Sequence, residues 1–569
     1  MPSLQQLRPA LLAAIVFVLA FDAAFLWQQV GGARVSEFGG HPDEAAHYVT
    51  GLMIRDYVAA RFPGAPMKYA DDYYSHYPKI ALGIWPPVFY VVQAAWTLPF
   101  GVSRAALMLL MCVLAAVASM LVFVSLREDY GGFIGGLGAL LFISLPLVRE
   151  YYGMVMAETL STVFIFGATL AFGNFLDRGR ARDAWIFGIL SALAILTKGT
   201  GVALAPMAGL ALLFTRRWAV LKRPVLWGAV VLIAVLAGPW TWFFRKKGAG
   251  GWEQAAPSLA WSREAIVYFL TKFGISLGIL VLLFFVVGVL VRLRAVSKAA
   301  SAAPASESAG EVETKNPPST SGRWACMGAL IVAVIVFQSI VPAGKEARHL
   351  IPTLPAAVAF AMAGFAFCLQ GAMKTFRLSS ELTPFPLRNV RAALPLLLAG
   401  TILVAGSVFP ITARRWSGFA QLAVDALREA QPADTMLISS DANGEGMFIA
   451  EIAMRDPKRP SYTVKRASKE LAASEWSGRG YHEKYESDDD LLGFLTGKVR
   501  YLAMDDTMPE SKRVPHHDTL KRVVDVDSGH FWQLGTSEIW RGGEAQMAPA
   551  RLFRIEKSDS AKTPDHKTK

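Results

Sequence analysis

Long uncharged apolar runs separated by short polar segments fill the first 412 residues of the chain. Runs of about 18 or more apolar residues can cross a bilayer as helices. The pattern therefore predicts a polytopic α-helical membrane protein with about 11 transmembrane helices over residues 1–412. The predicted spans are about 9–29, 103–126, 131–148, 155–175, 184–197, 199–214, 225–243, 266–291, 324–341, 350–371 and 393–412. The 184–197 and 199–214 pair is short for a bilayer.

The first apolar run, Pro9–Gln29, has the length of a spanning helix rather than of a signal peptide. No small-residue cleavage site follows it closely, and the aromatic residues Phe25 and Trp27 lie near its outer end. We expect it to be an uncleaved helix.

The pattern after residue 412 alternates between helical and strand periodicity, which predicts a small C-terminal α/β domain over 413–555. A polar tail over 556–569 is expected to be disordered. The predicted elements are helices over Trp416–Ala430 and Gly444–Met454, and strands over Thr435–Ser440, Tyr462–Val464 and Val499–Met504.

Two further segments have characteristic compositions. The apolar stretch 85–99 is short and begins with Pro86 and Pro87. We expect it to lie along the outer interface, inside a large extracytoplasmic loop over about 31–102. The segment 292–323 is rich in Ala, Ser, Pro and Glu, which is typical of a disordered cytoplasmic linker.

Charge supports this topology and argues against a nucleic-acid partner. The chain has 57 Lys+Arg and 45 Asp+Glu, a net charge of +12, and only 18% of its residues are charged. Soluble domains average about 25%, and this low fraction together with the long uncharged apolar runs excludes a soluble enzyme. From Ala413 onward 24 basic and 25 acidic residues nearly cancel, so the excess lies in the membrane part.

Basic residues in the short loops give the orientation. With the N-terminus inside, the cytoplasmic segments hold 18 Lys+Arg, whereas the opposite short loops hold 8. Eleven spans would then place the C-terminal domain outside the cytoplasm. We expect an integral protein of the bacterial inner (cytoplasmic) membrane.

Cysteine usage indicates neither a disulfide framework nor a zinc site. The three cysteines, Cys112, Cys326 and Cys368, all lie inside apolar runs. No metal or other cofactor is required by the residues, although acidic side chains could bind a divalent ion.

Acidic residues provide the first candidate chemistry. Asp43 and Glu44 follow the first span by about a dozen residues, and a carboxylate near an apolar boundary can act as a base. The alternative is that Asp43 caps a helix that has Glu44 in its first turn. Glu158, at the start of a later span, is a third candidate, and its alternative is an interface-exposed carboxylate.

Three basic residues lie on the predicted outer side, against the orientation rule: Lys198, Lys345 and Arg348. The phosphate of an anionic lipid is a natural ligand for such cations. Lys198 occupies a tight turn, Thr197–Gly201, whose small residues would let a head group approach the backbone. The alternative is headgroup anchoring, or for Arg348 an ion pair with Glu346.

These residues resemble the motifs of GT-C glycosyltransferases, similar to glycosyltransferase family 39. That family includes dolichyl-phosphate-mannose–protein mannosyltransferases and bacterial aminoarabinose transferases of lipid A. The order and spacing match over roughly 35–360. The matching marks are Asp43-Glu44, Trp85-Pro86-Pro87-Val88-Phe89-Tyr90, Glu158, Thr197-Lys198-Gly199, and Arg348-His349-Leu350 before Pro352 and Pro355.

The resemblance implies transfer of a sugar from a polyprenyl-phosphate donor to a glycan, lipid or protein acceptor at the outer face, with inversion. It implies that Asp43 is the base and that Lys198 and Arg348 hold the donor phosphate. The site residues that we assign are Asp43, Glu44 and Glu158 as catalytic, and Lys198, Arg348, His349, Lys345 and Lys79 as phosphate-binding.

One departure from the family concerns the first loop. In the aminoarabinose transferases an acid and a lysine precede the loop's proline, whereas here that position is Gly83-Ile84-Trp85. His76 and Lys79 are the nearest substitutes for the missing pair.

Two other functions fit parts of the pattern. A transporter or lipid flippase would explain many spans and outer cations, but it predicts internal repeats or charges near the bilayer midplane. A sensor or scaffold would bind a partner through the C-terminal domain, whose near-neutral charge gives no support. A liposome flux assay and a partner-binding assay would distinguish these from a transferase.

Overall fold

The computed structural model describes residues 4–246, 257–302, 321–375, 415–432, 434–474, 480–527 and 529–556. The backbone divides into two compact units. The membrane unit comprises residues 1–28, 83–89 and 109–411. The α/β unit comprises residues 29–82, 90–108 and 412–569, so it joins the first loop to the C-terminal domain.

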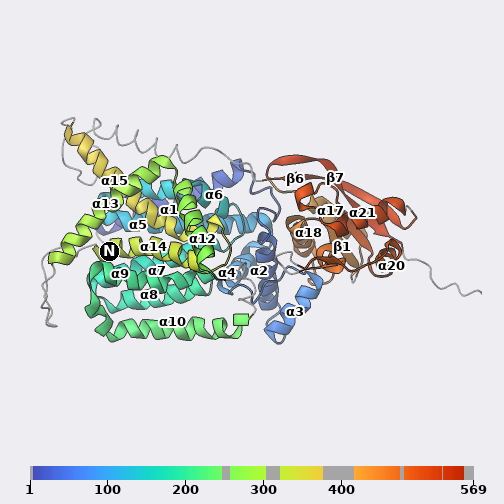
Figure 1. The fold of residues 1–569 in the computed structure, drawn as a ribbon, viewed down its shortest axis with the longest axis horizontal. Helices are drawn as coiled ribbons and strands as arrows, with labels where there is room; N and C mark the ends of the chain where they lie inside the picture. The colour runs from blue at the N-terminus through green and yellow to red at the C-terminus, as the bar shows by residue number, and fades with distance from the viewer. Residues whose placement is uncertain are drawn as a thin grey trace, which may run out of the picture. The chain divides into compact units, whose positions relative to one another are not determined.

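The membrane unit is a bundle of apolar helices, which confirms the predicted polytopic helical fold (Figure 1). Within the described residues, six helices are long and apolar enough to cross a membrane, or seven if the bent pair α12–α13 is one span. The elements are α1 (Leu4–Val30), α5 (Arg104–Ser144), α6 (Pro146–Tyr152), α7 (Glu158–Arg178), α8 (Ala181–Ile195), η1 (Gly199–Ala203), α9 (Leu204–Thr215), η2 (Trp218–Lys222), α10 (Pro224–Phe243), α12 (Leu259–Leu277), α13 (Ile279–Ala302), α14 (Ser321–Ile340), η3 (Ala347–Thr353) and α15 (Leu354–Thr375).

Glycines break two of the apolar runs. The predicted spans 103–126 and 131–148 both lie in α5, which is interrupted at Gly131, where φ is 80° and ψ is 172°. The predicted span 266–291 is divided between α12 and α13, which meet at Gly278 (φ 73°) with a bend of 107°. Glycine adopts positive φ without a steric penalty. The predicted span 393–412 lies outside the described residues.

Helix α7 occupies the interior of this bundle. It packs against α8 and α14, and α8 in turn packs against α10 (Figure 1). Gly173 lets α14 approach α7 closely, since a Cβ atom there would lie 2.6 Å from the Cα of Arg323. The absence of a side chain at this position therefore sets the spacing of the two helices.

The C-terminal end of α7 is tied to the start of α14 by one carboxylate. Asp177 accepts hydrogen bonds from the backbone N–H of Gly322 (2.7 Å) and Arg323 (3.0 Å). Its Oδ1 also lies 3.3 Å from Nη1 of Arg217. Backbone N–H groups at a helix start have no partner within the helix, so Asp177 satisfies donors that would otherwise be unpaired.

The α/β unit contains a five-stranded sheet of order β2-β1-β5-β7-β6. The strands are β2 (Thr463–Arg466), β1 (Thr435–Ser439), β5 (Tyr501–Asp505), β7 (Glu544–Ile555) and β6 (Phe531–Arg541). Strand β1 is parallel to both β2 and β5, whereas β7 is antiparallel to β5 and β6. The predicted α/β domain is confirmed, and the β6–β7 hairpin is an addition that the sequence did not predict.

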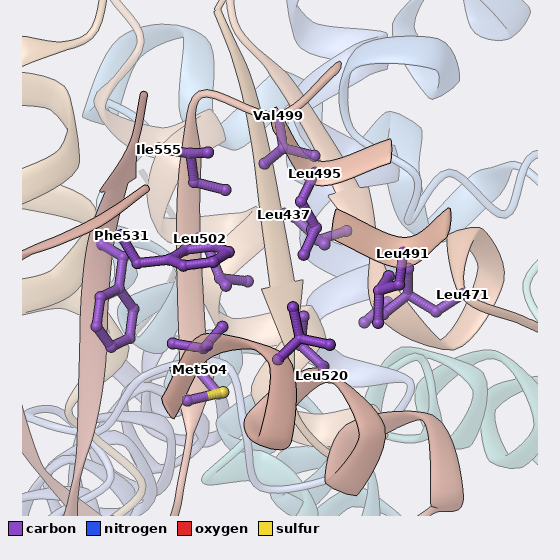
Figure 2. Close-up of a cluster of buried hydrophobic side chains, with 14 residues drawn as sticks. Leu437, Leu471, Leu491, Leu495, Val499, Leu502, Met504, Leu520, Phe531 and Ile555 are labelled. Atoms are coloured by element: carbon purple, nitrogen blue, oxygen red, sulfur yellow. The ribbon is translucent and has the colours of Figure 1, made fainter. Parts of the chain in front are cut away.

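Helices flank this sheet and complete its core. Figure 2 shows side chains of the strands and of helices α20 and α21 converging on one apolar cluster, with Leu437 from β1 and Leu502 from β5. The remaining elements of the unit are α17 (Phe419–Glu429), α18 (Ala442–Arg455), α19 (Ala467–Glu470), β3 (Ala472–Ala473), β4 (His482–Glu483), α20 (Asp488–Lys498), η4 (Glu510–Lys512) and α21 (Pro515–Val526).

The first loop folds against the C-terminal domain through α2 (Glu44–Ala59) and α3 (Pro66–His76). The buried Asp56 accepts a hydrogen bond from the hydroxyl of Tyr73 (3.0 Å) and pairs with Nε of Arg459 (2.8 Å). The short apolar helix α4 (Val88–Phe100) has 13 residues, fewer than the roughly 20 that a spanning helix needs. Its place at the membrane interface stays a prediction.

Replacing Asp177 by alanine is expected to destabilise the membrane unit by about 3 kcal/mol, because breaking a buried, hydrogen-bonded ion pair leaves polar groups without partners. The Asp177 side chain is 4% exposed. The midpoint of thermal unfolding of the detergent-solubilised full-length protein would fall accordingly.

Glu264→Ala provides the control for this prediction. It removes the partner of Lys345 from a pair whose carboxylate is 68% exposed, and water screens such pairs. Its midpoint should stay close to that of the unmodified protein. Equal shifts in the two variants would contradict the assignment to Asp177.

Candidate active site

A buried carboxylate with two cations lies at the N-terminal end of α7. Nζ of Lys198 is 2.5 Å from Oε1 of Glu158, and Nε of Arg348 is 3.5 Å from the same oxygen. The Glu158 side chain is 2% exposed, against 21% for Lys198 and 12% for Arg348. The membrane unit thus brings together three of the residues that the sequence singled out.

The turn between α8 and α9 presents Lys198. Lys198 has an extended backbone (φ −158°) and immediately precedes η1. Gly201 allows the turn to close, since a Cβ atom there would lie 2.6 Å from the backbone of Ala194 and Ile195. The hydroxyl of Thr200 accepts a hydrogen bond from Gln338 of α14 (3.1 Å), which fixes the turn to the bundle.

The segment before α15 presents Arg348. Its Nε lies 2.6 Å from Oε2 of Glu346, and its Nη2 lies 3.1 Å from Oε1 of the same carboxylate. The pair with Glu346 that the sequence offered as an alternative is therefore present, alongside the contact with Glu158. Two-point contacts of this kind fix the plane of a guanidinium group.

The neighbours of Arg348 differ in their surroundings. Lys345 pairs with Glu264 of α12 (2.9 Å) and lies over the ring of Trp261. Its ammonium group is therefore paired with Glu264 and not with Glu158. The buried ring of His349 contacts Phe269, with centroids 6.5 Å apart. In the described part of the chain neither ring nitrogen of His349 has a hydrogen-bond partner.

The net charge of this cluster is close to zero, with two carboxylates and two cations. Glu346 is the most exposed member, at 34%. Lys198 has three N–H donors, and the contact with Glu158 uses one of them. An anion that entered here would find cations already fixed in a water-poor surrounding, where electrostatic attraction is strong.

An apolar groove of about 460 Å³ lies between α12, α13 and α14. Its lining includes Leu270 and Phe273 of α12, Phe285 of α13 and Ile335 of α14. Helix α12 also carries Phe269, which contacts His349 beside Arg348. Helix α12 therefore lines the groove and also contacts the residue next to Arg348.

In the α/β unit the two adjacent carboxylates of the first loop differ in role. Glu44 is fully buried, pairs with Nη1 of Arg104 (2.9 Å) and accepts a hydrogen bond from the N–H of Gly40 (2.9 Å). Asp43 does not cap α2 with its side chain. Its carboxylate is 29% exposed and lies 3.5 Å from Nδ1 of His41. Asp43 therefore suits the role of a base, and Glu44 holds the loop.

Arg104 is a residue that the sequence did not single out. Its Nε donates to the carbonyl of Ala33 (3.1 Å), and its guanidinium lies 4.9 Å from the ring centroid of Phe38. A signal was available, because an arginine at the first position of a long apolar helix needs an anionic partner when it is buried.

Lys79 lies among charged groups of the α/β unit. Its Nζ donates to the carbonyl of Ala442 (3.2 Å). The pKa of Lys79 is lowered to about 8, mainly by burial and also by the nearby Arg466, although Glu445 and Asp43 act in the opposite direction. Lys79 is therefore an electrostatic neighbour of Asp43. His76, the other substitute for the missing pair, is half-buried and its Nδ1 lies 3.0 Å from the carbonyl oxygen of Asp72 in its own helix.

Within the described ranges, no three His, Cys, Asp or Glu side chains are grouped so that they could hold a metal ion.

One family model and several solved structures are similar to this chain. The family model of dolichyl-phosphate-mannose-protein mannosyltransferases matches residues 85–243. No curated protein matches the sequence. The matched segment contains Glu158 and Lys198.

Solved structures match nearly the whole chain. ArnT from Cupriavidus metallidurans bound to undecaprenyl phosphate is 14% identical, with a TM-score of 0.53 over 94% of this chain and 97% of that one. The apo form of the same protein is also 14% identical, with a TM-score of 0.56 over 97% of this chain and 98% of that one. The Archaeoglobus fulgidus oligosaccharyltransferase tethered with an acceptor peptide is 13% identical, with a TM-score of 0.52 over 93% of this chain and 74% of that one. The GT-C fold expected from the sequence resemblance is confirmed.

The lowered pKa of Lys79 has a consequence for stability. Between about pH 8 and the ordinary lysine value of 10.5, the unfolded chain binds a proton that the folded chain has released. The free energy of unfolding therefore increases as the pH rises through this window. Lys79→Met lacks this gain, so any stability advantage of the variant at pH 7 should shrink towards pH 9.5.

Thermal unfolding of both proteins across this pH range measures the difference. The exposed Lys498 provides the matched control as Lys498→Met. A difference between the unmodified protein and Lys79→Met that stayed constant with pH would contradict the lowered pKa.

Proposed function

We propose that this chain, a GT-C-type membrane glycosyltransferase, moves a sugar from a polyprenyl-phosphate carrier to a glycan, lipid or protein acceptor. The observation that carries the proposal is the pair of cations, Lys198 and Arg348, fixed against the buried Glu158. Charged groups at the edge of a membrane span are costly and often mark a functional site.

Lys198 and Arg348 bind the donor phosphate in this proposal. As the bond between the sugar and the phosphate oxygen breaks, negative charge grows on that oxygen. Fixed cations in a water-poor site stabilise the developing charge without reorganising. Glu158 keeps both cations in place before the donor arrives, and this role explains why it is buried with them.

The polyprenyl chain of the donor is assigned to the apolar groove between α12, α13 and α14. The groove has a volume of about 460 Å³ and an apolar lining, which suits a branched hydrocarbon. The ArnT structure contains undecaprenyl phosphate, a lipid of this class. The shared helix α12 would let one donor molecule occupy the groove and reach the cations.

Asp43 acts as the general base. It removes the proton from the acceptor hydroxyl, whose oxygen attacks the anomeric carbon while the electron pair of the breaking bond passes to the phosphate. A single displacement of this kind inverts the anomeric configuration. The carboxylate of Asp43, which is 29% exposed, suits this role better than that of Glu44, which is buried and paired with Arg104.

We assign the reaction to the extracytoplasmic face of a bacterial cytoplasmic membrane. The support is the sequence: 18 Lys+Arg lie in the segments assigned to the cytoplasm, against 8 in the opposite short loops. The acceptor then comes from the cell envelope.

Asp43→Asn tests the base. The full-length protein in nanodiscs is given a panel of undecaprenyl-phosphate-linked sugars together with an envelope extract, and release of undecaprenyl phosphate is followed by mass spectrometry. We expect the variant to lose about 10²- to 10⁴-fold in kcat, because an amide cannot accept the proton. Its thermal midpoint should stay near that of the unmodified protein. A folded variant with full activity would refute the role of Asp43.

Lys198→Met tests the phosphate site in the same assay. A charge-assisted hydrogen bond contributes about 2 kcal/mol, so kcat/KM for the donor should fall at least tenfold. Lys272→Met is the matched control, since Lys272 is a half-buried lysine of the membrane unit that lies over the ring of Tyr268. The assignment fails if both variants lose the same activity.

A further inference from the structure

A hydrogen bond from the C-terminal domain reaches the loop that carries Asp43. The side-chain amide of Asn443, in the first turn of α18, donates to the carbonyl of Gly39 at 2.6 Å. Asn443 is 7% exposed. Gly39 opens the segment 39–44, which we call the Asp43 loop and which ends where α2 begins.

Asn443 is not needed to cap its own helix. The N-cap of α18 is Asp441, whose Oδ1 accepts from the N–H of Gly444 at 2.8 Å. Arg541 (3.0 Å) and Lys512 (3.3 Å) hold the other carboxylate oxygen of Asp441. The amide of Asn443 is therefore available to a partner outside the helix, and the partner it holds is the Asp43 loop.

Two glycines let the loop and α18 approach each other. A Cβ atom on Gly39 would lie 2.3 Å from Sδ of Met447. A Cβ atom on Gly446 would lie 2.9 Å from Cβ of Ala45 in α2 and 3.2 Å from Cε of Lys79. A larger residue at Gly446 would press on Cβ of Ala45 and push α18 away from α2, whereas one at Gly39 would first displace the flexible side chain of Met447.

Hydrogen bonds inside the loop transmit this placement to Asp43. The N–H of Glu44 donates to the carbonyl of His41 (3.0 Å), and the N–H of Asp43 donates to Nδ1 of His41 (3.1 Å). On the other side Glu44 is paired with Arg104. The loop is thus held at one end by Arg104 and at the other by Asn443.

We propose that helix α18 of the C-terminal domain positions the catalytic loop, with Asn443 as the positioning residue and with Gly39 and Gly446 permitting the close approach. The inference rests on the proposed function, because it takes Asp43 as the base. It gives the C-terminal domain a part in the transfer reaction: its helix α18 determines where the base stands, while the domain's own side chains need not touch the sugar.

Hydrogen exchange tests the positioning without any substrate. In the full-length protein, Asn443→Ala should speed exchange of the backbone amides of 40–47 at least tenfold. Gly446→Ala should do the same by separating α18 from α2. Ser487→Ala removes the N-cap of α20, so it perturbs the C-terminal domain elsewhere and should leave these amides unchanged. Unchanged exchange in Asn443→Ala, or equal acceleration in Ser487→Ala, overturns the proposal.

Kinetics supplies the second readout, using the release of undecaprenyl phosphate. Asn443→Ala should lower kcat by about 10- to 100-fold, since small displacements of a catalytic group are costly, while KM for the donor changes by less than about twofold. Asn443→Asp should be more impaired, because a carboxylate repels the Gly39 carbonyl. Wild-type kcat in Asn443→Ala overturns the proposal even if exchange is faster.

The same series separates the two proposals from each other. If Asp43→Asn retains activity, the base assignment of the proposed function fails, and the exchange measurement still decides whether α18 holds the loop. If Asp43→Asn is inactive but Asn443→Ala behaves like the unmodified protein, only the positioning proposal fails.

Discussion

The membrane unit depends on how a buried carboxylate is kept charged. Glu158 lies at the start of α7 with almost no exposure, and an isolated charge in such a place is costly. Lys198 and Arg348, from two separate segments, offset this cost by pairing with the carboxylate. The turn after α8 and the 3-10 segment before α15 therefore have to converge on α7, and the sites of both cations follow from that one requirement.

The sequence predicted the members of this cluster better than its geometry. Cations that violate the orientation rule stand out in an apolar sequence, so Lys198 and Arg348 could be found by pattern alone. The pairing of Arg348 with Glu346 and the different partner of Lys345 could not, because neighbouring residues in an irregular segment point in directions that depend on tertiary contacts. The bend at Gly278 was also hidden, since a glycine in an apolar run is compatible with a straight helix.

Long-range contacts were the other limit. The regular alternation of apolar residues predicted β1, β5 and the α/β class of the C-terminal domain. It did not indicate that the first loop would fold with that domain. Asp56 with Arg459, and Asn443 with Gly39, join residues about 400 positions apart. Such pairs leave no periodic trace in a single sequence, so the different surroundings of Asp43 and Glu44 became visible only with Arg104 in place.

The two ends of α7 also define a length. Glu158 and its cations stand at one end, and Asp177 with Arg217 and the start of α14 stand at the other. At 1.5 Å per residue the helix separates these charged layers by about 28 Å, close to the roughly 30 Å of a bilayer's hydrocarbon core. Because moving either charged layer into hydrocarbon costs free energy, the two layers fix the position of the protein along the membrane normal. A markedly thicker bilayer would have to thin around it. In the proposed reaction, the protein rather than the lipid would then fix the depth at which the donor's phosphate meets the cations.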